Sequence, residues 1–234
     1  MTIDQNRPEA SCASCPIVKS TERRCVRPDG KNPPNCPTAL DAEAAARSLA
    51  VYKSEEFHEM ARVASQVERA GYERGVGGLH ATRPRIVELV DFAKRMKYTK
   101  LGLIFCMGLR KEAAISAKIF ETNDFEVVSA ICKVGCLPKS ELGLTPEEQL
   151  RPTGHESMCN PVMQADITNR AGVHLNILLG LCVGHDSLVL AHLDAPATIL
   201  AVKDRLLGNN PLAALYTYDT YHAWLQKPLF PEAE

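Results

Sequence analysis

Short runs of apolar residues alternate with amphipathic segments over the second part of the chain. Four apolar runs predict buried strands, and apolar residues spaced three and four positions apart predict the helices between them. The predicted strands are 100–105, 125–131, 173–181 and 197–202, and the predicted helices are 85–97, 110–121 and 161–170. Near-continuous apolar strands separated by helices are typical of a parallel sheet covered on both faces. The pattern therefore predicts an α/β fold, a Rossmann-like parallel sheet of about four strands flanked by helices.

The first 80 residues have a different pattern. Segment 1–38 is rich in proline and lacks apolar periodicity, so it cannot build a core of its own. Strong helix formers follow, with Asp41 as a predicted N-cap and a break near Ser54. We expect a cysteine-rich segment at 1–38, a helical segment at 39–80 ending in a flexible glycine-rich connector, and an α/β domain at 81–234. We also expect the aromatic residues between 216 and 224 to cover that domain.

Charge excludes two classes of partner. The chain carries 27 Lys and Arg against 28 Asp and Glu, whereas binding to nucleic acid or an anionic membrane requires a large basic excess. Its apolar runs are shorter than the roughly 20 residues of a membrane helix, and its polar start lacks a signal-peptide core. We therefore expect a cytoplasmic protein that binds neither nucleic acid nor membrane.

Nine cysteines change this picture, because a cysteine-rich chain in a reducing cytosol is typically a metal-binding or redox protein. Four of them fall in the first segment with the spacing Cys-x2-Cys-x9-Cys-x10-Cys. A Cys-x2-Cys pair with two more distant cysteines suits a tetrahedral zinc site or an iron–sulfur cluster, and the spacing leaves both open. The predicted ligands of this metal centre are Cys12, Cys15, Cys25 and Cys36.

Three later cysteines each follow a predicted strand directly. Cys106, Cys132 and Cys182 come after the first, second and third strands, and Cys159 precedes the helix that leads into the third. Because the carboxyl ends of parallel strands share one edge, we expect these thiols to converge there. The strand order 2-1-3-4 would place Cys106 beside Cys182. Thiolates brought from separate strand ends suit a cluster, and a [4Fe-4S] cluster is the predicted cofactor.

Other polar residues fall at the same predicted edge. His185 could ligate a metal, donate a proton or cap the following helix, and Lys133 could bind an anionic substrate or balance thiolate charge. We take both as catalytic candidates, although strand ends are commonly polar where they meet water. Cys136 is an alternative ligand to Cys132, and His155 lies four residues before Cys159. The roles of Cys136 and His155 stay open.

Several of these segments together resemble one family. They are 102–113 (GLIFCMGLRKEA), 132–135 (CKVG), 159–161 (CNP), 180–186 (GLCVGHD) and 203–216 (KDRLLGNNPLAALY). The chain is similar to the prokaryotic domain-of-unknown-function family 1847 over essentially its whole length, including the cysteine-rich start. The resemblance implies cysteine-bound metal, mostly in anaerobic prokaryotes, and implies no particular reaction.

The leading hypothesis is an iron–sulfur protein with redox or sulfur-transfer chemistry, which would require an electron-transfer partner or a small-molecule substrate. Zinc is the alternative at the N-terminal site, and the alternative function is a zinc-binding structural or sensor protein without catalysis. A third hypothesis is a thiol enzyme with Cys106 or Cys182 as nucleophile and His185 as base. The sequence does not choose a substrate or an oligomeric state.

Overall fold

A computed structural model describes residues 9–230, so the predicted segments 1–38 and 81–234 extend beyond the described residues at 1–8 and 231–234. The chain divides into two compact units, the first ending at Ser65 and the second beginning at Gln66. This division falls inside the predicted helical segment 39–80. The three-part division made from the sequence stays a prediction.

The first unit consists of short helical turns and one longer helix. From residue 9 to residue 62 no described side chain is buried, so this stretch lacks a hydrophobic core, as predicted for the part of it that belongs to segment 1–38. The side chain of Asp41 accepts a hydrogen bond from the backbone of Ala44 (2.9 Å), which confirms the predicted N-cap. The helical elements are η1 (Cys12–Ser14), η2 (Ser20–Glu22), α1 (Pro37–Leu40), α2 (Ala42–Tyr52) and α3 (His58–Ala70), the last of which crosses the division between the units.

The glycine-rich connector is not an irregular loop. Strands β1 (Tyr72–Gly75) and β2 (Gly78–Ala81) pair antiparallel as a hairpin, so the prediction of a flexible connector is wrong. Gly77 and Gly78 have φ angles of +89° and +129°, which L-residues rarely adopt, and they allow the tight turn.

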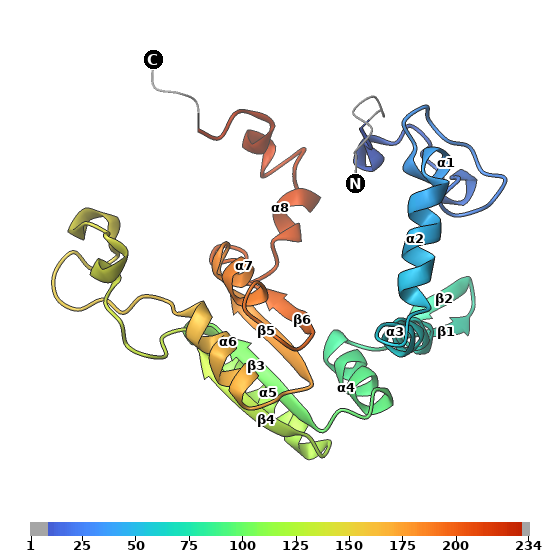
Figure 1. The fold of residues 1–234 in the computed structure, drawn as a ribbon. Helices are drawn as coiled ribbons and strands as arrows, with labels where there is room; N and C mark the ends of the chain where they lie inside the picture. Colours follow the sequence, from blue (N-terminus) through green and yellow to red (C-terminus); the bar gives the residue numbers. More distant parts are fainter. Residues whose placement is uncertain (1–8, 231–234) are drawn as a thin grey trace. The chain divides into compact units, whose positions relative to one another are not determined.

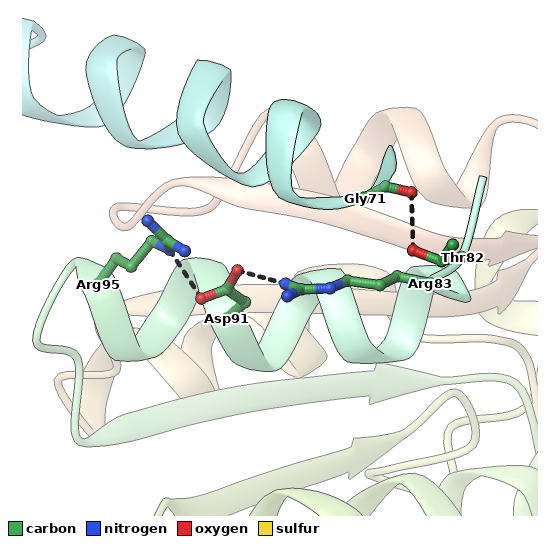
Figure 2. Close-up of polar contacts among 5 residues, drawn as sticks. All are labelled: Gly71, Thr82, Arg83, Asp91 and Arg95. Atoms are coloured by element: carbon green, nitrogen blue, oxygen red, sulfur yellow. Dashed lines mark hydrogen bonds and ion pairs between the residues drawn. The ribbon is translucent and has the colours of Figure 1, made fainter. Parts of the chain in front are cut away.

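Three polar contacts stabilise the chain where it passes from the hairpin into α4 (Arg85–Arg95). The carbonyl of Gly71 accepts a hydrogen bond from the Thr82 hydroxyl at 3.3 Å, and Asp91 pairs with Arg83 at 2.8 Å and Arg95 at 2.7 Å (Figure 2). Hydrogen bonding by Arg95 is the main cause that lowers the pKa of Asp91, and burial opposes it. Asp91 is therefore ionised at neutral pH.

The second unit is built on a four-stranded parallel sheet, as predicted. Its strands are β3 (Lys100–Phe105), β4 (Glu126–Ile131), β5 (Leu175–Leu181) and β6 (Ala197–Val202), and their order in the sheet is β4-β3-β5-β6 (Figure 1). In order of sequence this is the arrangement 2-1-3-4, on which the expected nearness of Cys106 and Cys182 depends. The chain reverses its direction across the sheet between β3 and β5, which is the point where open α/β sheets bind ligands.

Helices cover both faces of the sheet. On one face, α4 and α5 (Arg110–Thr122) pack Leu89 and Phe120 against Leu103 and Ile177 of the central strands. On the other face, Ile104 and Leu178 pack against Val189 of α7 (His185–Leu190), and α6 (Pro161–Arg170) packs beside α7. Removing these side chains from water is the main stabilising contribution to the unit.

The remaining helical elements are η3 (Met107–Leu109), η4 (Lys139–Leu142), η5 (Pro146–Glu148), α8 (Leu212–Tyr216) and η6 (Ala223–Gln226). The expected aromatic cover is wrong, because Tyr216, Tyr221 and Trp224 are 76%, 88% and 57% exposed. Among helices of the described part of the chain, none combines the length and apolarity that crossing a membrane requires.

Candidate functional site

The carboxyl edge of the sheet gathers cysteines from distant parts of the sequence. Cys106 directly follows β3, Cys132 follows β4 and Cys182 follows β5. Cys159 lies before Asn160, the N-cap of α6, and the backbone of Asn160 donates a hydrogen bond to the Cys132 carbonyl (2.8 Å). This bond places the start of α6 beside the end of β4, at the same edge as the strand ends.

Cys132 is at the centre of a group of three thiols. It is 3% exposed, and its Sγ accepts a hydrogen bond from the backbone N–H of Met107 at 3.3 Å. Hydrogen bonding with Cys159 and burial raise the pKa of Cys132, and the charges of Cys159 and Cys106 raise that pKa further. The pKa of Cys132 is thus raised and that of Cys159 is lowered, which favours the proton on Cys132.

Cys159 is the thiolate of this pair. The hydrogen bond from Cys132 is the main cause that lowers the pKa of Cys159 to about 5, burial opposes the shift, and the charges of Lys133 and His185 reinforce it. The two catalytic candidates predicted from the sequence thus lie near one ionised sulfur. Lys133 also donates a hydrogen bond from Nζ to the Ser157 carbonyl (2.5 Å).

Further cations lie near Cys182 and Cys106 at this edge. Arg205 donates a hydrogen bond from Nη2 to Cys182 Sγ at 3.0 Å. Gly108 lies beside both Cys106 and Lys203. A Cβ added at this glycine would be 3.9 Å from Cys106 Sγ and 3.4 Å from Lys203 Nζ. The strand ends therefore combine thiols with positive charge.

Gln164 is a residue of this edge that the sequence did not predict. Its side chain is 1% exposed, and its Nε2 donates to the carbonyls of Phe105 (3.2 Å) and Ala130 (2.7 Å). These bonds tie the ends of β3 and β4 to α6, next to Cys106 and Cys132. The sequence held one indication of this role. Gln164 and Thr168 are four residues apart, so both polar side chains lie on the same face of α6, and that face is buried.

The four N-terminal cysteines come together in the first unit. All four line one pocket of about 50 Å³, together with Arg23 and several polar and proline residues. Local backbone bonds shape this loop, including one from the N–H of Cys15 to the Cys12 carbonyl (3.3 Å) and one from Ala39 to the Cys36 carbonyl (3.1 Å). The pocket matches the predicted grouping of Cys12, Cys15, Cys25 and Cys36.

All nine cysteines are free thiols. Within residues 9–230, no group of three or more His, Cys, Asp or Glu side chains already has the arrangement of a metal site. The predicted ligands and cofactors therefore stay predictions. Cys136 and His155, whose roles the sequence left open, contact each other at 3.5 Å.

Comparison with known proteins identifies the family. A family model described as "Protein of unknown function (DUF1847)" matches residues 36–200. An uncharacterized protein of Methanocaldococcus jannaschii is 40% identical over 166 residues, which cover 71% of this chain and 80% of that relative. The family match is narrower than the resemblance over essentially the whole chain, because it begins at Cys36 and ends before segment 203–216. It includes all the thiols of the sheet edge, and the chain belongs to the DUF1847 family.

Proposed function

We propose that the chain is an iron–sulfur protein whose cluster, of the [4Fe-4S] type, is bound at the carboxyl edge of the sheet. The observation that carries this proposal is the convergence of Cys106, Cys132 and Cys159, which are distant in sequence and interact electrostatically. Thiols of a purely structural core are typically separate, protonated and surrounded by apolar side chains. Here the pKa of Cys159 is lowered to about 5, and that of its neighbour Cys132 is raised.

The donor set fits a cluster. Iron–sulfur clusters are held by thiolates, and Cys159 is already ionised at neutral pH. Cys182 is the proposed fourth ligand, and its bond from Arg205 is of the kind that tunes a ligand sulfur. Lys133, Lys203 and Arg205 supply positive charge that would stabilise an anionic cluster.

Such a cluster would supply redox or sulfur-transfer chemistry. If Cys106, Cys132 and Cys159 alone bind it, one iron remains open to a ligand. His185 and Lys133 are then the proposed catalytic residues, since their charges act on Cys159 at the same edge. The proposal therefore includes an electron-transfer partner or a small-molecule substrate in the cytoplasm.

We propose a second metal centre in the pocket of the first unit. Its four thiols come from a segment without buried side chains, where bound metal would replace the missing core. A set of four cysteines suits zinc and iron–sulfur clusters alike, so zinc is the alternative here. A chain with zinc in this pocket and an empty sheet edge would be a structural or sensor protein.

Anaerobic purification of the full chain tests the proposal, with iron, acid-labile sulfide and zinc measured together with visible absorption and the electron paramagnetic resonance spectrum after reduction. We expect about four irons and four sulfides per chain from the sheet edge. Cys132→Ser and Cys159→Ser should abolish that fraction, whereas Cys12→Ser and Cys15→Ser should remove only the metal of the N-terminal pocket. Cys136→Ser is the matched control and should retain both. Colourless wild-type protein without iron or sulfide would contradict the proposal.

A further inference from the structure

A second group of reactive side chains lies in the segment between β4 and α6. Cys136 Sγ is 3.5 Å from His155 Nε2 and 3.4 Å from Ser157 Oγ. His155 Nε2 and Ser157 Oγ are 2.9 Å apart. Cys136 is exposed and has a φ of +50°, a left-handed conformation that is uncommon for a residue with a side chain. A thiol, an imidazole and a hydroxyl thus meet at one accessible point.

This group borders a pocket of about 320 Å³. Its lining includes His155 and Ser157, together with Lys133, Arg151 and Glu156. The carboxylate of Glu156 is engaged already, because it accepts bonds from the Lys139 ammonium (2.7 Å) and the backbone of Arg151 (2.9 Å).

The pocket is therefore net positive. Lys139 offsets Glu156, and the guanidinium of Arg151 forms no ion pair with any carboxylate in the described part of the chain. Lys133 also lines the pocket, with its ammonium oriented by the Ser157 carbonyl and partly offset by Cys159, so Arg151 supplies the unpaired positive charge. Two cations beside a thiol and an imidazole form a site for an anionic ligand.

We propose that Cys136 is the nucleophile of a thiol site that takes up a small electrophile carrying an anionic group. His155 Nε2 accepts the thiol proton, with the other ring proton on Nδ1, and Lys133 and Arg151 bind the anionic group. The Cys136 sulfur then forms a bond to the electrophilic carbon, and the leaving group departs with the electron pair of its own bond to that carbon. The step needs no oxidant or reductant.

Apart from Lys133, whose charge also acts on Cys159, the site shares no residue with the proposed metal centres. Its Cys and His alone are fewer than the three protein ligands of even an open zinc site. If Cys136 were nevertheless a metal ligand, its alkylation would be blocked until a chelator removed the metal, and that outcome would overturn the proposal.

Two alkylating reagents test the site in the full chain as purified. Iodoacetate and iodoacetamide share the attacked carbon and the leaving group, but only iodoacetate is anionic. The rate at Cys136 is followed by peptide mass spectrometry, and the same chain unfolded in urea supplies the reference ratio. We expect the ratio of iodoacetate to iodoacetamide rates to be about tenfold higher in the folded chain, the effect of one favourable charge contact.

Variants separate the roles of the site residues. His155→Gln should slow both reagents by about 100-fold, the contribution typical of a general base. Arg151→Gln should slow iodoacetate alone, and Arg170→Gln, a surface arginine at the far end of α6, is the matched control and should change neither rate. Acetate or inorganic phosphate should protect Cys136, and the stronger protectant identifies the anion. An unchanged rate ratio on folding, no effect of His155→Gln, or no protection by either anion would each contradict the proposal.

Discussion

Replacing Cys132 tests how strongly it lowers the pKa of Cys159 at the sheet edge. Cys132→Ala removes the hydrogen bond that is the main cause of the low pKa of Cys159. With its pKa at about 5, Cys159 is almost fully ionised at neutral pH. A thiol at its ordinary pKa of about 8.5 is only about 3% ionised at that pH, so complete loss of the shift would reduce the thiolate about 30-fold.

Lys133 and His185 remain in the variant, and their charges still favour the thiolate. We therefore expect the pKa of Cys159 to rise by about one to three units rather than to the ordinary value. Cys132→Ser keeps a hydroxyl donor at the same place and is the matched control, with a smaller rise.

The assay is alkylation of metal-free, reduced protein by iodoacetamide across a pH series, with Cys159 read by peptide mass spectrometry. The midpoint of the pH profile is the readout, because nucleophilicity rises with pKa and partly offsets the change in rate. Circular dichroism should confirm that each variant is folded. The reasoning is refuted if Cys132→Ala leaves the midpoint of Cys159 unchanged.

Two further predictions concern the fold. Asp91→Asn should lower the free energy of unfolding by about 1 kcal/mol at neutral pH. Because pairing with two arginines lowers the pKa of Asp91 (Figure 2), its contribution is present above the unfolded-state pKa of about 3.9 and disappears as pH falls through the folded-state pKa. Thermal unfolding of wild type and variant should therefore converge in acid, and a constant difference would contradict this. Gly180→Ala should cost about 3 kcal/mol in urea unfolding, because φ is +69° and the new Cβ would overlap a Leu109 methyl carbon. Gly172→Ala is the control, because Gly172 has a φ of +63° and open space around it, and it should cost only about 1 kcal/mol. Equal losses of stability in the two variants would contradict the prediction, because the overlap with Leu109 would then add nothing.

The sheet could be predicted because its central strands, β3 and β5, are buried on both faces. Residues 100–105 and 175–181 are apolar almost throughout, a pattern typical of strands in a covered parallel sheet. Once the strands are parallel, thiols placed directly after them must share an edge. The placement of Cys106, Cys132 and Cys182 at one edge therefore followed from topology, whereas Cys159 joins them through the start of α6.

Other features depend on tertiary contacts that no local pattern reports. The β1–β2 hairpin is short and exposed, so it lacks the apolar alternation that indicates a strand. The bond from Arg205 to Cys182 and the two bonds from Gln164 to strand-end carbonyls depend on how loops and helices dock. The aromatic residues near the C-terminus are apolar enough to suggest burial, and they are exposed.

The most direct test is anomalous diffraction at the iron edge from crystals of the full chain prepared without oxygen. The account predicts an iron–sulfur cluster bonded to Cys106, Cys132 and Cys159, with Cys182 as its fourth ligand or beside an open iron. A map without anomalous signal at this edge, in which these thiols remain unligated, would contradict it.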